Sequence, residues 1–183
     1  MKKVVFTLIT LWLFSMVCHA KSMLTDSIIK PTPRPSLLAM SALKVGNMYL
    51  KIVYGQPLKK GRTIFGALEP YGKVWRTGAN EATEVTFTKD VRINNKILKA
   101  GTYTLFSIPE QTKWTIIFNS ELGQWGAYKY NPAKDVLSIV VDVKRNEVIY
   151  EALTFTFVEN PTGADLIMQW DDIKLGIPLV FSK

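Results

Sequence analysis

Apolar and polar positions alternate with a period of two along most of the chain. The clearest runs are 50–54, 137–143 and 153–157, where every second residue is apolar. In the last of these, Leu153, Phe155 and Phe157 alternate with two threonines. Such alternation is typical of strands that bury one face. The same pattern predicts further strands over 84–93, 102–108, 114–119, 165–170 and 173–181.

Short turn signals separate these runs. They are Asn94-Asn95, Ala100-Gly101, Pro109-Glu110, Asn131-Pro132 and the segment 160–163. No long helical pattern is present, and only one short helical turn is expected, over 36–43. Pro178 marks the last strand as an edge strand or as the exit of the chain. The sequence therefore predicts an all-β fold, an antiparallel β-sandwich or jelly-roll-like single domain.

The N-terminus has the three parts of a secretory signal peptide. A basic head at Lys2-Lys3 precedes an apolar run over 4–17 and a small-x-small exit, Cys18-His19-Ala20. We expect cleavage after Ala20. The apolar run is shorter than the roughly 20 residues of a membrane-spanning helix. The alternatives are an uncleaved membrane anchor and a lipid anchor on Cys18, which the bulky Val17 disfavours.

This N-terminal pattern sets the expected domain organisation and location. We expect a signal peptide over 1–20, a proline-rich linker over 21–36 and the β-sandwich domain over 37–183. The protein would be exported to the periplasm or beyond the cell, with no transmembrane segment in its mature chain. Lys2 and Lys3 leave with the signal peptide, so 21 of the 23 basic residues remain against 15 acidic ones, a net charge of +6. An exported basic protein points to a glycan or an anionic envelope component as partner rather than to nucleic acid.

Cleavage also removes the only cysteine and the only histidine, Cys18 and His19. A mature chain without imidazole cannot form a Ser-His-Asp triad. Zinc sites, which are built mainly from Cys and His, are disfavoured as well. Neither a phosphate-binding G-x-x-x-x-G-K-[ST] loop nor a G-x-S-x-G elbow is present. We expect no cofactor and no metal.

Carboxylates remain as possible catalytic groups, because glycosidases need only two acids. Glu81 and Glu84 are the obvious pair, but in an extended segment residues three apart point to opposite faces. A pairing of Glu81 with Asp171 or Asp172 stays open. The loosely spaced oxygen ligands Asn160, Asp165, Asp171 and Asp172 fit turn capping better than a calcium site.

The densest group of unusual residues lies over 61–83. This stretch holds four glycines, three basic residues, two carboxylates and three aromatic residues, with poor periodicity. Long ordered loops on a β scaffold often carry binding residues. The candidate site residues are Arg62, Tyr71, Lys73, Trp75, Arg76, Asn80 and Glu81. The structural alternative places Trp75 in the core and pairs Arg76 with Glu81. The second aromatic stretch, 124–130, is expected to cover one end of the sandwich.

Several motifs resemble those of a known family of exported bacterial proteins, the domain of unknown function 2911 family. They are Lys60-Gly61-Arg62, 64–66, 70–83, 100–103, Ile108-Pro109, 114–119 and 124–128. The resemblance covers about 34–181, and one departure is Asp171 after Trp170, where the family tends to have glutamate. It implies a β-sandwich and no established activity, substrate or cofactor.

The leading hypothesis is a non-enzymatic envelope domain that binds a ligand or partner through the 62–81 loop region. The first alternative is a histidine-free enzyme that acts on a glycan through carboxylates, which requires two acids in one open cleft. The second alternative is a purely structural envelope module, which would expose a broad apolar patch rather than a hollow.

Overall fold

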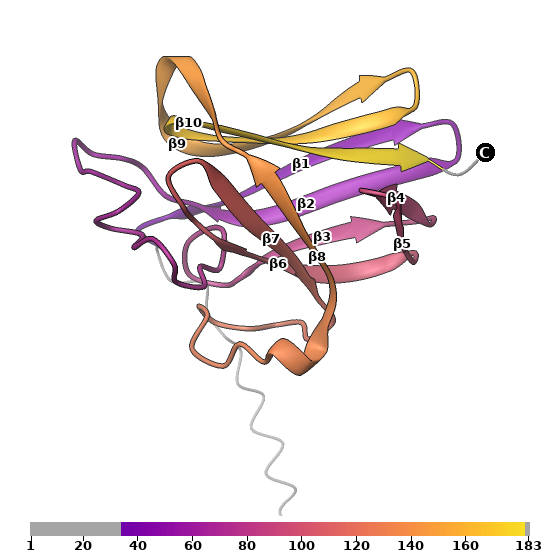
Figure 1. The fold of residues 1–183 in the computed structure, drawn as a ribbon, viewed down its shortest axis with the longest axis horizontal. Helices are drawn as coiled ribbons and strands as arrows, with labels where there is room; N and C mark the ends of the chain where they lie inside the picture. The colour runs from indigo at the N-terminus through magenta and orange to yellow at the C-terminus, as the bar shows by residue number, and fades with distance from the viewer. Residues whose placement is uncertain (1–33, 182–183) are drawn as a thin grey trace, which may run out of the picture. The chain divides into compact units, whose positions relative to one another are not determined.

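The alternating runs form two antiparallel sheets in the computed structural model, which describes residues 34–181 (Figure 1). The predicted signal peptide and most of the predicted linker lie outside these residues. The larger sheet has the order β1 (Leu37–Val45), β2 (Met48–Gln56), β3 (Thr83–Phe87), β6 (Gly101–Ile108), β7 (Lys113–Asn119) and β8 (Asp135–Asp142). The smaller sheet has the order β5 (Lys96–Leu98), β4 (Val91–Ile93), β10 (Gly163–Phe181) and β9 (Lys144–Asn160). A short 3-10 turn spans Pro132–Lys134. The predicted all-β antiparallel sandwich is confirmed.

One core lies between the two sheets, because each strand turns every second side chain inward. Leu50, Ile52 and Tyr54 of β2 are buried, as are Leu153 and Phe155 of β9. The rings of Tyr54 and Phe155 meet edge to face with centroids 4.8 Å apart, which joins the two sheets directly.

The helical turn expected over 36–43 is wrong. These residues form β1, which pairs with β2 along its whole length, from Leu37 opposite Gln56 to Val45 opposite Met48. The run Leu37–Met40 has good helix propensity, but tertiary pairing with β2 overrides so weak a preference.

The single strand expected over 84–93 is two strands in different sheets, β3 and β4. Asp90 fixes the crossing between them, because its carboxylate accepts hydrogen bonds from the Ala100 amide and the Lys99 ammonium, both at 2.9 Å. The short β5 was not expected. It pairs with β4 across the predicted Asn94-Asn95 turn, where both residues have positive φ.

β10 reverses direction at Asp171-Asp172, so its two halves match the two strands expected over 165–170 and 173–181. The Phe181 amide donates to the Thr162 carbonyl at 3.0 Å. Sixteen residues of extended chain would instead separate Gly163 from Leu179 by about 50 Å, yet a Cβ built on Gly163 would lie 2.1 Å from the Leu179 carbonyl oxygen. Asp171 has φ 55°, as a tight hairpin turn requires.

A second, smaller apolar cluster lies on the outer face of the larger sheet. Ala82, Phe106 and Ile117 form its centre, and Ala127 and Tyr130 pack on it. The Tyr130 ring meets Phe106 at 5.0 Å, and its hydroxyl donates to Asp135 at 2.5 Å. Segment 120–134 therefore covers the outer face of β6 and β7.

Candidate functional site

The structure places the seven predicted site residues in different parts of the domain, so they do not form one site. Trp75 belongs to the core. It is 3% exposed and stacks on Trp170 at 5.9 Å, while Phe65 meets it edge to face at 5.9 Å. Its indole N–H donates to the Gly78 carbonyl at 3.1 Å. Trp75 is thus unavailable for stacking on a ligand.

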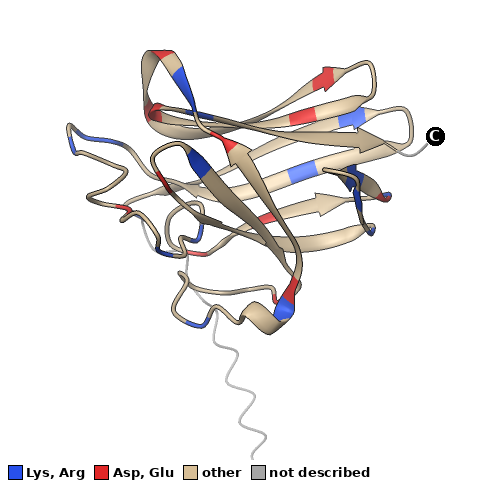
Figure 2. Ribbon diagram, in the orientation of Figure 1, with Lys and Arg blue, Asp and Glu red and all other residues tan. Residues whose placement is uncertain are grey.

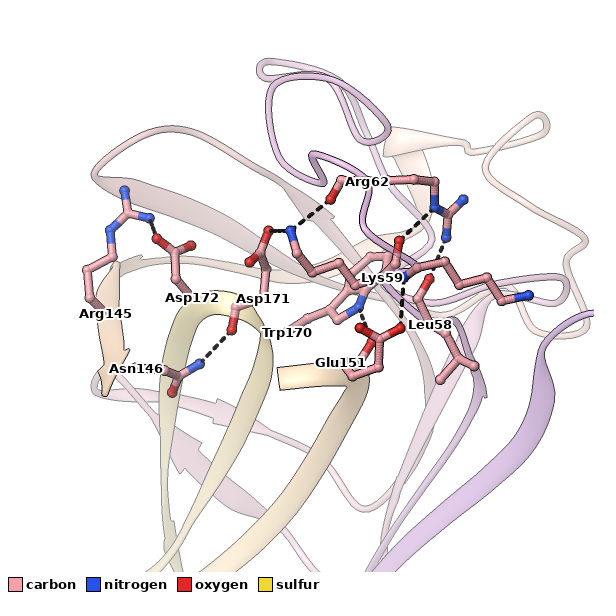
Figure 3. A network of polar contacts seen from close by, with 10 residues as sticks. Leu58, Lys59, Arg62, Arg145, Asn146, Glu151, Trp170, Asp171 and Asp172 are labelled. Atoms are coloured by element: carbon pink, nitrogen blue, oxygen red, sulfur yellow. Dashed lines mark hydrogen bonds and ion pairs between the residues drawn. The ribbon is translucent and has the colours of Figure 1, made fainter. Parts of the chain in front are cut away.

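Arg62 lies in a polar network that ties the 58–62 segment to the hairpin turn of β10 (Figure 3). Its guanidinium donates to the carbonyls of Leu58 and Lys59. The Lys59 ammonium in turn donates to the Asp171 carboxylate at 2.6 Å and to the Arg62 carbonyl at 2.7 Å. Both charges of the Lys59–Asp171 pair are largely enclosed, with 20% and 15% of the side chains exposed. Arg62 therefore has a structural role in this network.

The same network fixes the other side of the turn. Trp170 donates its indole N–H to the Glu151 carbonyl at 3.3 Å, and Asp172 pairs with Arg145. Asn146 donates to the Ile173 carbonyl at 2.8 Å. The residue at which the chain departs from the family motif, Asp171, is thus both the turn residue and the partner of a lysine.

A half-buried acid, Glu69, lies near Arg76 in the loop between β2 and β3. Burial raises the pKa of the Glu69 carboxyl to about 7, although the positive charges of Arg76 and Arg62 lower it. The Arg76 Nε is buried and has no hydrogen-bond partner within residues 34–181. The positive charge of Arg76 therefore interacts with the Glu69 carboxyl. The predicted pair of Arg76 with Glu81 is not formed, because Glu81 pairs with Arg34.

Tyr71 and Lys73 lie on the surface of that loop. Tyr71 is half-buried, and its ring occupies the space in which a Cβ on Gly66 would lie, 2.7 Å from Tyr71 Cε2. Lys73 is exposed and makes no ion pair within the described residues. These two residues do not converge on Glu81.

Glu81 lies at a different place, where the N-terminal arm of the domain meets the loop before β3. Its carboxylate accepts a hydrogen bond from the Arg34 guanidinium at 2.5 Å. The neighbouring Asn80 donates from its side chain to the Ser36 carbonyl at 3.1 Å. Asn80 has φ 63°, a left-handed conformation that Asn tolerates. The buried Thr77 has φ 52°, which is strained for a β-branched residue and typical of segments that position a site.

Arg34 and Glu81 border a hollow of about 230 Å³ on the outer face of β1, β2 and β3. Leu38, Val53 and Ala82 form apolar walls, and Glu81, Glu84 and Arg34 supply the charges. We call it the β1–β3 hollow. The side chains of Arg34 and Glu81 retain 40% and 39% exposure, so their ion pair contributes only about 0–1 kcal/mol to stability and stays accessible to a ligand.

Glu81 and Glu84 both line this one hollow. The expectation that they point to opposite faces holds for an extended segment, but β3 begins only at Thr83 and the preceding Asn80 is left-handed, so this condition is not met. One Glu84 oxygen accepts a hydrogen bond from the Gly123 amide at 2.9 Å. With two carboxylates and one guanidinium, the hollow has a net charge of −1.

The segment around Trp125 lies alongside residues 80–84. The Ala82 amide donates to the Gln124 carbonyl at 2.9 Å, and the Gly126 amide donates to the Asn80 carbonyl at 3.0 Å. Trp125 is the antiparallel bridge partner of Glu81, and directly opposed residues project from the same face. Trp125 is 60% exposed and Tyr128 is 86% exposed, whereas Tyr130 packs on Phe106 at the outer face of the larger sheet. The expectation that the 124–130 rings cover one end of the sandwich is therefore wrong.

Within residues 34–181, no cluster of three or more His, Cys, Asp or Glu side chains is placed to hold a metal ion. The same range contains no helix that is long and apolar enough to cross a membrane.

The chain belongs to the family described as "Protein of unknown function (DUF2911)", whose model matches residues 36–179. This match agrees with the motifs found in the sequence. Neither the curated proteins nor the solved structures contain a match to this chain.

Proposed function

We propose that this is an exported, non-enzymatic domain that binds a saccharide of the cell envelope in the β1–β3 hollow. The observation that carries the proposal is the combination of Arg34, Glu81 and Glu84 in one small hollow, with the exposed Trp125 as the bridge partner of Glu81. Carboxylates accept hydrogen bonds from hydroxyl groups, a guanidinium donates them, and an indole face packs on the apolar face of a sugar ring. The export part of the proposal rests on the signal-peptide pattern of residues 1–20.

The charge of the hollow narrows the class of saccharide. Two carboxylates against one guanidinium disfavour an anionic polymer and favour a neutral or amine-bearing sugar. The volume of about 230 Å³ accommodates one ring or a short branch rather than a long chain. Of the predicted 62–81 binding loop, only the C-terminal end, Asn80 and Glu81, takes part in the proposed site. The other residues of the site come from β1, β3 and segment 123–125.

Binding of neutral, amine-bearing and anionic oligosaccharides to purified protein by calorimetry tests this proposal. We expect Glu84→Gln and Trp125→Ala to weaken binding about tenfold or more while the thermal unfolding temperature stays near that of the wild type. The matched controls are Glu159→Gln, an exposed acid on β9, and Tyr49→Ala, an aromatic residue at the other end of β2. Equal loss of binding in the controls, or preference for anionic polymers, contradicts the proposal.

A second function is favoured by one specific observation, the presence of Glu81 and Glu84 in the same hollow. Two acids across a sugar are the minimum requirement of a glycosidase. Release of reducing ends from the saccharides that bind would support it, provided that Glu84→Gln abolishes the release. Binding without turnover over long incubation supports the non-enzymatic function instead.

A further inference from the structure

Two lysines face each other on the smaller sheet. Lys144 of β9 and Lys174 of β10 are direct partners in the antiparallel ladder. Directly opposed side chains share a face and have Cβ atoms about 5 Å apart, where like charges destabilise the pairing. Neither lysine belongs to an ion pair within residues 34–181. The register therefore brings together two positive charges that no ion pair of the described residues joins to an acid, although Lys174 also lines a neighbouring hollow with Glu147.

The two lysines also line a hollow of about 290 Å³ on the outer face of β10, with Asn94, Gly176 and Pro178 at its border. Gly176 carries no side chain, and the Ile167 side chain borders the position of its missing Cβ at 3.5 Å. Lys174 is half-buried. Asn94 stands at the turn between β4 and β5 and carries an amide donor. We call this site the lysine-pair hollow.

The only acid at the border of this hollow is Asp142. Its carboxylate lies 3.4 Å from the Lys113 ammonium, and its side chain is 74% exposed. Asp142 therefore shares its single negative charge between Lys113 and the lysine pair, which leaves the hollow with an excess of positive charge. Figure 2 shows that acidic and basic residues are otherwise dispersed over strands and loops, without a continuous basic run.

We propose that the lysine-pair hollow binds a phosphate group. A phosphate monoester carries a charge of about −1.5 to −2 at neutral pH and three strong acceptor oxygens, so it bridges two ammonium groups and removes their repulsion. Because the β1–β3 hollow has the opposite charge, the two sites select different ligands. The phosphate comes either from a soluble ester or from a lipid headgroup.

Titration of the purified protein with inorganic phosphate, monitored by thermal unfolding, tests the proposal. Chloride at the same ionic strength serves as reference, because phosphate also stabilises proteins non-specifically. We expect phosphate to raise the unfolding temperature of the wild type beyond the chloride reference. We expect the control Lys89→Gln, an exposed lysine in the turn after β3, to respond as the wild type does.

The informative variant is Lys144→Glu, which turns the repulsive pair into an attractive one and keeps the fold. We expect it to unfold at a higher temperature than the wild type at low salt without phosphate. We also expect its apparent affinity for phosphate to fall at least about tenfold. If the two lysines had only a structural role, Lys144→Glu would change the stability of the protein without weakening its response to phosphate. Equal phosphate responses of wild type and Lys144→Glu would overturn the proposal.

Two further ligands distinguish the sources of the phosphate. Binding of glycerol 3-phosphate in solution without retention on vesicles that contain phosphatidic acid, a lipid with a phosphate monoester, indicates a soluble ester. Retention on these vesicles but not on phosphatidylcholine vesicles, lost in Lys144→Glu, indicates a lipid headgroup. Glu84→Gln alters only the β1–β3 hollow, so it should leave ester binding and vesicle retention unchanged. The phosphate proposal can therefore fail while the saccharide proposal stands, and the reverse also holds.

Discussion

Replacement of Trp75 by alanine tests whether this residue belongs to the core or to a binding surface. Its ring is 3% exposed, packs on Trp170, Phe65 and Trp114, and donates a hydrogen bond to Gly78. Truncation of a buried Trp to Ala costs about 3–5 kcal/mol. Loss of the donor to a buried carbonyl adds about 1 kcal/mol. We therefore expect Trp75→Ala to lower the free energy of unfolding by about 4–6 kcal/mol.

This loss corresponds to a fall of about 8–24 °C in unfolding temperature for a domain of this size. Urea unfolding followed by tryptophan fluorescence and circular dichroism measures it. Trp125→Ala is the matched control, because Trp125 is 60% exposed and its truncation should change stability by only about 0.5 kcal/mol. If Trp75→Ala cost less than about 1 kcal/mol, or as little as Trp125→Ala, the assignment of Trp75 to the core would be refuted.

Three further predictions concern stability. Lys59→Ala leaves the enclosed Asp171 carboxylate without its partner and should cost about 2–3 kcal/mol in urea unfolding; a cost below about 0.5 kcal/mol would show that the pair is dispensable. Gly55→Ala places a Cβ 1.9 Å from the Ala79 carbonyl oxygen and should cost at least about 2–3 kcal/mol, whereas wild-type stability would mean that the backbone can yield there. The pKa of Glu69 is raised to about 7 in the folded state, so the folded state binds its proton more tightly than the unfolded state does. Stability should therefore fall by about 2 kcal/mol as pH rises from 4.5 to 7, and Glu69→Gln should remove this part of the slope; an unchanged slope in the variant contradicts it.

The strands could be predicted because burial on one face imposes a two-residue period on the sequence. Leu153, Phe155 and Phe157 form part of a core face in the sequence pattern and in the structure alike. The first strand was mistaken for a helical turn because only every second residue of β1 is even half-buried, which leaves a weak signal. The pairing with β2 that decides its conformation is not visible in local sequence.

The candidate site was harder to predict, because irregular loops carry no periodicity. Trp75 is buried by contacts with Trp114 and Trp170, which lie far away in sequence. Arg34 was assigned to the linker, and only the fold brings its guanidinium to Glu81. The exposed Trp125 lies in a motif that the sequence singled out, but its place beside Glu81 depends on a bridge between two loops.

A nuclear magnetic resonance titration of the labelled protein with an oligosaccharide that binds in calorimetry tests the central claim most directly. If the β1–β3 hollow is the binding site, the largest shifts will occur at the amides of Glu81, Glu84 and Gly123 and at the indole N–H of Trp125. Shifts confined to Arg62, Lys73 and their neighbours, with the Trp125 indole unmoved, would contradict the assignment.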